Sequence, residues 1–228
     1  MTANLRQVTV QIVGMFVVIG LALFLAAGTV AWLGGWAFLV LFFGFTVALT
    51  RWLLRHNPGL LTERMTGISN AAQKNWDKVF YVVANLYFLA WLVVMPLDAA
   101  RFHWSHMPAW LQVVGAVLLL CSFPLFFLTF RENAFLSPAV RVQTEREHMV
   151  VSTGPYHYVR HPMYATAIIF LVGTAILLGS WIGVFMGLIL VVGVAFRAVQ
   201  EERTLRAELA GYDEYMAQVK YRLIPYVW

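Results

Sequence analysis

The sequence predicts an all-α, polytopic membrane protein with about six transmembrane helices. Hydrophobic residues make up 61% of the 228 residues and charged residues only 12%, with a mean hydropathy of +0.73. Soluble domains usually carry about a quarter charged residues, so this chain has too few to cover a water-facing surface. The same composition argues against an extended disordered segment, a disulfide-rich secreted scaffold and a nucleic-acid-binding domain.

Four uncharged stretches of at least 19 residues predict four membrane helices, at 8–27, 30–50, 79–97 and 108–130. Each stretch is long enough to cross a hydrocarbon core about 30 Å thick. A fifth uncharged stretch, 163–196, has 34 residues and would be about 51 Å long as one straight helix. Because Gly179 and Ser180 lie at its midpoint, we interpret it as a hairpin of two helices of about 17 residues each.

The distribution of basic residues supports this hairpin. With six helices, 15 of the 16 Lys and Arg residues lie on one side of the membrane, and only Arg101 lies on the other. If 163–196 crossed the membrane only once, 10 of the basic residues would lie on one side and 6 on the other. Because cytoplasmic loops are enriched in Lys and Arg, we expect both termini to be cytoplasmic, in a bacterial inner membrane.

We expect one membrane domain over residues 1–228, divided into three portions. These are an N-terminal helix pair (1–54), central helices (79–130), and a catalytic, cofactor-binding portion (131–228) that contains the hairpin 163–196. A polar loop, 51–78, joins the first two portions, and its last residues, 74–78, form an amphipathic lead into the third helix. Polar chemistry therefore collects on the predicted cytoplasmic side.

The first candidate site motif is the segment 154–164, GPYHYVRHPMY. Pro162 suits the first position of the following helix, where its missing N–H costs nothing. Arg160 and His161 are thereby placed at a helix N-terminus, which favours a carboxylate or a phosphate. The alternative interpretation is that Arg160 is a positive-inside anchor and the tyrosines are interfacial residues. No metal site is expected, because the prolines argue against one helix through His157 and His161.

The second motif is RAVQEERTL, residues 197–205, at the exit of the last predicted helix. Arg197 and Glu201 are spaced i,i+4 on one helix face, whereas Glu202 points about 100° away. Adjacent carboxylates are unfavourable near a helix C-terminus, so a cation should lie close by, either an arginine or a charged ligand. The alternative is a solvated amphipathic helix with ordinary surface ion pairs.

Together the two motifs resemble the isoprenylcysteine carboxyl methyltransferase family, integral membrane methyltransferases related to phospholipid N-methyltransferases. The segments that follow the family's order and spacing are 160–164 (RHPMY), the hairpin, Glu201-Glu202, 211–215 (GYDEY) and 222–225 (RLIP). Residues 57–64 (NPGLLTER) and 131–135 (RENAF) extend the resemblance more weakly over most of the chain.

The resemblance implies that S-adenosyl-L-methionine is the methyl donor, bound in a cytoplasmic pocket between the hairpin, the 154–164 segment and the tail. By position, the cofactor-binding residues would be Tyr156, Arg160, His161, Tyr164 and Glu201. Arg197 and Glu202 match the pair that looks catalytic in the prenylcysteine enzymes. The methyl acceptor would be small or lipophilic, for instance a membrane lipid, and would present a carboxylate, a thiol or an amine.

Several alternatives stay open at this point. Arg131, Glu132, Asn133 and Phe135 are candidates to contact the cofactor or the acceptor, or to cap the end of the fourth helix. A membrane NADPH-dependent reductase of the sterol-reductase type is the second enzyme class, and a transporter or scaffold is the non-enzymatic one. The sequence does not define the oligomeric state.

Overall fold

The computed structural model describes residues 4–66 and 73–228, and every regular element in this part of the chain is a helix. The predicted all-α class is confirmed. The helices are α1 (Leu5–Ala27), α2 (Leu33–His56), α3 (Pro58–Thr66), α4 (Asn75–Pro96), η2 (Leu97–Arg101), α5 (Ala109–Glu132), η3 (Thr144–Arg146), η4 (Gly154–His157), α6 (Pro162–Leu177), α7 (Trp181–Glu208) and α8 (Tyr212–Gln218). Most of the predicted 51–78 loop is helical, in α2, α3 and α4, while its residues 67–72 lie outside the described part.

Five helices of the described chain are long and apolar enough to cross a membrane: α1, α2, α4 with η2, α5 and α7. The sixth apolar helix, α6, has only 16 residues. The hairpin is asymmetric, since α6 has 16 residues and α7 has 28. Its last 12 residues, roughly three turns, continue beyond the uncharged stretch and carry the second motif. This fold fits an integral, multi-pass membrane protein.

The turn between α6 and α7 is fixed by a buried carboxylate. Ser180 caps α7 by accepting a hydrogen bond from the Gly183 N–H at 2.8 Å, and its hydroxyl donates to Asp98. Asp98 is fully buried in η2 and also accepts from the Ser105 hydroxyl at 2.6 Å. The hairpin turn is thus joined to the connection between α4 and α5.

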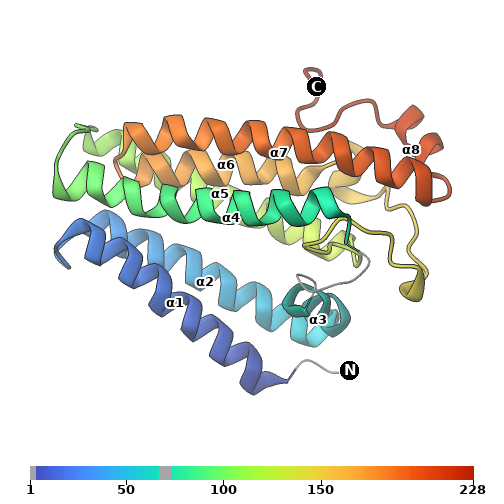
Figure 1. Ribbon diagram of the computed structural model, residues 1–228, viewed down its shortest axis with the longest axis horizontal. Helices are drawn as coiled ribbons and strands as arrows, with labels where there is room; N and C mark the ends of the chain where they lie inside the picture. Colours follow the sequence, from blue (N-terminus) through green and yellow to red (C-terminus); the bar gives the residue numbers. More distant parts are fainter. Residues whose placement is uncertain (1–3, 67–72) are drawn as a thin grey trace.

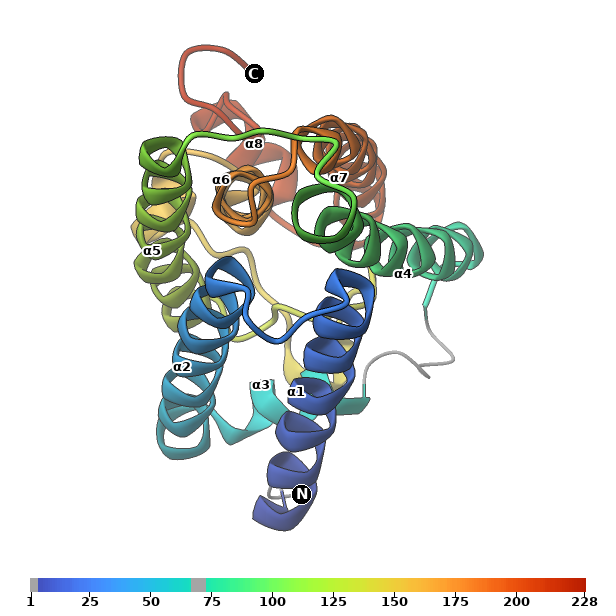
Figure 2. The same ribbon diagram turned by 90° about the vertical axis from the view of Figure 1, so that its left-hand side faces the viewer.

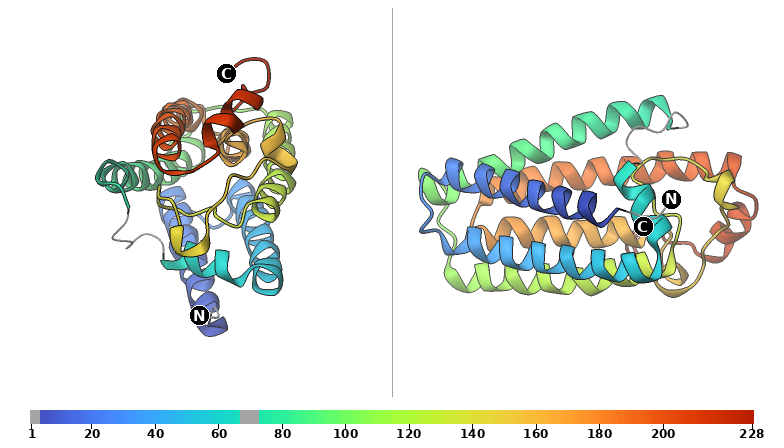
Figure 3. Two further views of the ribbon diagram at one scale, coloured as in Figure 1. Left: turned by 90° about the vertical axis from the view of Figure 1, so that its right-hand side faces the viewer. Right: turned by 90° about the horizontal axis from the view of Figure 1, so that it is seen from below.

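The helices run back and forth so that the polar segments meet at one end of the bundle. Figure 1 shows both termini, α3 and α8 at the same end, with the α6–α7 turn at the other. The view of that end in Figure 3 shows the 133–161 segment crossing it between α3 and α8. This is the arrangement that the basic-residue count requires; that the end faces the cytoplasm stays a prediction.

The N-terminal helix pair packs into the same core as the other helices. Seen end-on in Figure 2, α1 and α2 lie below α4, α5 and α6. Their buried side chains Leu23, Phe38 and Leu39 join one cluster with Trp91 of α4 and Leu119 of α5. The Trp91 indole also donates a 2.7 Å hydrogen bond to the Gly183 carbonyl, which ties α4 to α7.

Helices α5 and α6 approach each other closely because both carry glycine at the contact. A Cβ added to Gly115 would lie 2.3 Å from the Leu177 nitrogen, and one added to Gly173 would lie 2.9 Å from the Leu119 nitrogen. These neighbours are backbone atoms, which cannot rotate away as a side chain can. Small residues at such contacts let membrane helices pack backbone to backbone.

We therefore expect Gly115→Ala to destabilise the protein by about 1–3 kcal/mol, since it overpacks a contact made of backbone. Thermal unfolding of the detergent-purified variant measures the effect. Gly14→Ala is the matched control, because no atom lies within 4 Å of a Cβ added there. Equal midpoints for the two variants would contradict a close α5–α6 contact.

Candidate functional site

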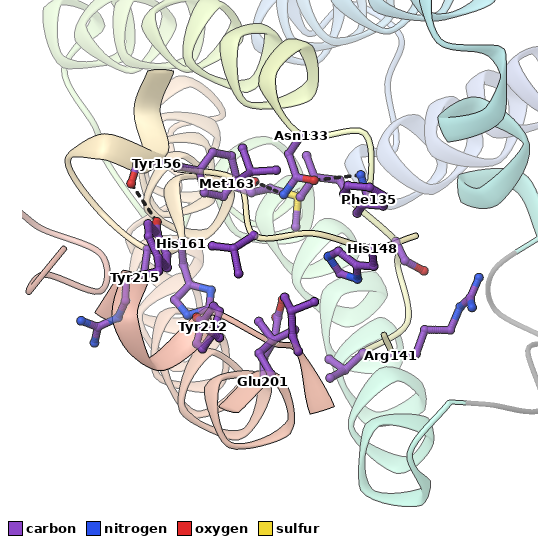
Figure 4. Close-up of a pocket in the computed structure, with 18 of the residues that line it drawn as sticks. Asn133, Phe135, Arg141, His148, Tyr156, His161, Met163, Glu201, Tyr212 and Tyr215 are labelled. Carbon is purple, nitrogen blue, oxygen red and sulfur yellow. Dashed lines mark hydrogen bonds between the residues drawn. The ribbon is translucent and has the colours of Figure 1, made fainter. Parts of the chain in front are cut away.

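A pocket at the end of the bundle that carries both termini is built from elements far apart in the sequence. Figure 4 shows side chains from the segment after α5, from η4, and from α6, α7 and α8 converging on it. The cavity volume is about 80 Å³, well below the roughly 300–1,000 Å³ of sites for drug-sized ligands. A ligand of nucleoside size therefore binds only if lining side chains move apart.

All five predicted cofactor-binding residues line this pocket: Tyr156, Arg160, His161, Tyr164 and Glu201. The two predicted catalytic residues, Arg197 and Glu202, are not among the lining residues. They lie directly behind the wall, where each is held by oppositely charged partners. The structure thus brings the predicted cofactor-binding residues together in one cavity. It places the two predicted catalytic residues behind the wall of that cavity.

Glu202 is the centre of a buried charged cluster. Its side chain is 3% exposed, and its carboxylate accepts hydrogen bonds from Arg160 Nε at 2.7 Å and Arg222 Nε at 2.8 Å. The His161 Nε2 atom lies 3.3 Å away. Three basic side chains around one carboxylate give the cluster an excess of positive charge. The sequence predicted a cation near the paired glutamates. Arg160, just before α6, and Arg222, in the C-terminal tail, provide it.

Arg160 also fastens the C-terminal tail to the bundle. Its Nη1 atom donates to the carbonyls of Val219 and Lys220 at 2.8 and 2.9 Å. The backbone N–H of Arg160 donates to the Tyr221 carbonyl, also at 2.9 Å. The sequence predicted an anion beside this helix N-terminus, and the Glu202 carboxylate of the protein itself occupies that position. Any ligand carboxylate would meet the remaining positive charge of the cluster.

Glu201 differs from its neighbour because no basic side chain of the described residues pairs with it. Its carboxylate lines the pocket and accepts a 2.6 Å hydrogen bond from the Tyr164 hydroxyl. The ring of Tyr164 stacks on His161 with centroids 5.5 Å apart. Glu201 therefore contributes a carboxylate without a direct ion pair to a pocket lined by aromatic rings, with the charge of Arg197 nearby on the same helix face. Such a site suits a cation.

Tyrosines of η4 and α8 close the same side of the pocket. The Tyr215 hydroxyl donates a 2.7 Å hydrogen bond to the Tyr156 carbonyl. Tyr212 is 4% exposed, and its hydroxyl is buried without a hydrogen-bond partner in the described structure. Burial raises the pKa of all three tyrosines, so they stay protonated at neutral pH. An unpaired buried hydroxyl at the wall of a cavity is costly and indicates a ligand group.

Arg197 is held by a carboxylate that the sequence analysis missed. Its Nη2 atom lies 3.1 Å from the Asp77 carboxylate and donates to the Pro138 carbonyl, while its Nε is buried and unpaired. Asp77 is fully buried and also accepts from the Val140 N–H at 2.9 Å. Residues 74–78 were expected to form an amphipathic lead into the third helix. Asp77 lies on the buried face of this segment, where it has a cationic partner on α7.

Asn133 links the segment after α5 to η4, and both Asn133 and Phe135 line the pocket. Its amide donates to the Tyr156 hydroxyl at 2.9 Å and its Oδ1 accepts from the Phe135 N–H at 2.8 Å. Glu132 accepts from the Thr153 hydroxyl at 2.9 Å. Gly154 then turns the chain at φ +56°, where a Cβ would lie 2.5 Å from the Glu132 Cγ. These residues join the end of α5 to η4; the RENAF pattern was the only signal for them.

The structure thus combines a charged, tyrosine-lined pocket with an apolar helical bundle that is able to cross a membrane. Residues 110–210 match the phospholipid methyltransferase family. Over α5, α6 and α7 the chain is therefore similar to integral membrane methyltransferases related to the isoprenylcysteine carboxyl methyltransferases, which confirms the resemblance seen in the motifs. The match indicates a membrane methyltransferase. A search of curated proteins found no match to the chain.

Proposed function

We propose that this protein is an S-adenosyl-L-methionine-dependent methyltransferase that acts on a small or lipophilic acceptor at the cytoplasmic face of the membrane. The observation that carries the proposal is Glu201, a pocket-lining carboxylate that forms no direct ion pair with any described residue. The family match over residues 110–210 supports the reaction class.

The charges of the pocket wall fit the proposed donor at two places. The Glu201 carboxylate suits a sulfonium or an ammonium group, and the faces of the tyrosines around it favour a cation as well. The Arg160–Arg222–Glu202 cluster has excess positive charge and suits a carboxylate. The unpaired Tyr212 hydroxyl adds a hydrogen-bonding group between them. S-adenosyl-L-methionine carries a carboxylate, an ammonium and a sulfonium group, so its charges complement those of this wall.

When bound, S-adenosyl-L-methionine supplies an electrophilic methyl group. The task of the protein is then mainly to position the reactants, because transfer from a sulfonium neutralises charge and good alignment provides much of the rate. The Tyr164 hydroxyl keeps the Glu201 carboxylate oriented through its 2.6 Å hydrogen bond. Arg197, fixed by Asp77, lies with its guanidinium 6.0 Å from the Tyr164 ring centroid, and its buried Nε has no hydrogen-bond partner among the described residues. We assign it the role of orienting the acceptor once the pocket wall opens.

The reductase alternative fits this wall less well. NADPH carries several phosphates, which require free basic groups. The basic residues that line the pocket are engaged: Arg160 and His161 contact Glu202, and Arg141 pairs with Glu63 and Glu145. No unpaired arginine or lysine of the described chain lines the cavity. We therefore favour a cationic ligand over a polyphosphate.

Isothermal titration of the detergent-purified protein with S-adenosylhomocysteine tests the proposal. We expect saturable binding at submillimolar concentration, and no comparable binding of NADPH. Incubation with methyl-labelled S-adenosyl-L-methionine and a bacterial lipid extract should then place label in the organic phase. Absence of S-adenosylhomocysteine binding together with binding of NADPH would replace the methyltransferase by the reductase.

A further inference from the structure

A groove between α1 and α2 lies at the end of the bundle opposite the functional pocket. Figure 1 shows the connection between these two helices at that end, away from both termini. This α1–α2 groove has a volume of about 780 Å³. It is lined by six residues of α1 between Phe16 and Leu25, by Trp36 and Leu39 of α2, and by the connection 28–30. The groove and the functional pocket share no lining residue.

The lining of the α1–α2 groove is almost entirely hydrocarbon. Only two of the described lining side chains are polar, and both are already hydrogen-bonded within the chain. The Thr29 hydroxyl accepts from the Ala31 N–H at 3.0 Å, and the Trp36 indole donates to the Val30 carbonyl at 2.8 Å. The Phe24 ring packs against Trp36, with centroids 4.7 Å apart. A polar ligand would gain few hydrogen bonds here, whereas an alkyl chain needs none.

An unpaired arginine lies at the mouth of the α1–α2 groove. Arg101, at the end of η2, donates a 3.2 Å hydrogen bond to the Leu25 carbonyl, and its guanidinium lies 3.7 Å from a Cβ added to Gly28. The side chain is exposed and forms no ion pair within the described chain. Asp98, the only acidic residue in 79–130, is fully buried in the hydrogen bonds of the hairpin turn. The mouth therefore carries a positive charge with no anion to match it.

The α1–α2 groove is about as long as one leaflet of a bilayer is thick. Along α1 it runs from Phe16 to its mouth at Gly28, which is about 18 Å at 1.5 Å per residue. Half of a hydrocarbon core about 30 Å thick is about 15 Å. After Arg101, the exposed rings of Phe102 and Trp104 are stacked, with centroids 4.8 Å apart, as suits residues at the membrane–water interface. The groove thus matches one acyl chain, whereas a membrane-spanning helix of a second copy would extend past its inner end.

We propose that the α1–α2 groove binds one anionic phospholipid, with an acyl chain along α1 and the headgroup phosphate on Arg101. A guanidinium suits this role because it can donate two parallel hydrogen bonds to phosphate oxygens. An anionic headgroup is preferred to a zwitterionic one, since an ammonium would add a second positive charge at the mouth. The bound lipid joins α1, α2 and η2. This site does not depend on the proposed function, because it lies outside the functional pocket.

Native mass spectrometry of the full-length, detergent-purified protein with added phosphatidylglycerol tests the headgroup contact. We expect one lipid to be retained per chain, and phosphatidylethanolamine to bind more weakly. Arg101→Gln should weaken phosphatidylglycerol binding about tenfold, as for the loss of one charge-assisted hydrogen bond. Arg6→Gln is the matched control, because Arg6 is an exposed arginine at the other end of α1. Inorganic phosphate, which has no acyl chain, should not displace the lipid.

Gly20→Leu tests the acyl-chain contact separately. A Cβ added to Gly20 meets only the Leu39 side chain, at 3.9 Å, so a leucine fits on α1 and extends into the groove. This variant should retain no lipid. Phosphatidylglycerol should raise the unfolding midpoint of the wild type, because it binds the folded state, and should leave that of Gly20→Leu unchanged. Gly14→Leu is the matched control, since Gly14 lies on the same helix in open space and does not line the groove.

Three results would overturn this lipid site. The first is a wild-type protein that retains no phosphatidylglycerol. The second is equal retention by the wild type, Arg101→Gln and Gly20→Leu, which would show that the lipid binds elsewhere on the apolar surface. The third is a lipid-free dimer that Gly20→Leu dissociates, which would assign the groove to a second copy of the chain. Thermal unfolding of each variant without lipid separates lost binding from lost folding.

Discussion

Glu202→Ala is expected to destabilise the protein by about 3–5 kcal/mol, the usual cost of removing one partner from a buried ion pair. The side chain is 3% exposed and is the shared partner of Arg160, His161 and Arg222. Without it, the buried Arg160 and the partly exposed Arg222 are left with no anion between them. We expect the tail to detach from α6 and α7, since Arg160 and Arg222 belong to the two segments that Glu202 joins.

Thermal unfolding and limited proteolysis of the purified variant measure this effect. The midpoint should fall sharply, and a protease should cut the tail after residue 219 at concentrations that leave the wild type intact. Glu214→Ala is the control, because Glu214 is an exposed glutamate of α8. A Glu202→Ala protein that unfolds like the wild type and keeps its tail protected would show that the cluster is not what holds the tail.

The helical hairpin and the single polar end were predictable because they depend on features that repeat along the chain. The runs of uncharged residues and the sidedness of Lys and Arg each involve many residues, so no single exception changes the outcome. Gly179-Ser180 then marks where the long run turns. The asymmetry of the hairpin was not predictable in this way. The polar residues after Phe196 continue α7 because helix propensity does not end where hydropathy does.

The roles of the paired glutamates required the structure. The sequence shows that Glu201 and Glu202 point in different directions and that a cation is needed, but Arg160 and Arg222 reach Glu202 from 42 and 20 residues away. Asp77 was missed for the same reason. Its partners Arg197 and Val140 lie far away in the sequence, so no local pattern marks it as buried.

Glu201→Gln is expected to weaken the binding of S-adenosyl-L-methionine by about 10–100-fold, because a charge-assisted contact contributes roughly 1.5–3 kcal/mol. The substitution keeps the shape of the side chain and its acceptor oxygen for the Tyr164 hydroxyl, and it removes only the negative charge. Stability should change little, since Glu201 forms no direct ion pair and Arg197 keeps its ion pair with Asp77. Binding of adenosine should be unchanged, because adenosine has no cationic group for the carboxylate to meet.

Isothermal titration with the two ligands separates charge recognition from a structural role. If Glu201 acts through its charge, only the cationic ligand loses affinity; if it merely shapes the pocket, both ligands lose affinity together. Glu214→Gln removes the same charge from an exposed position of α8 and controls for the general field of the protein. An unchanged affinity for S-adenosyl-L-methionine in Glu201→Gln would contradict the proposed function at its central observation. In that case, charge recognition of the ligand would depend only on the contact between the ligand's carboxylate and the positive cluster around Glu202.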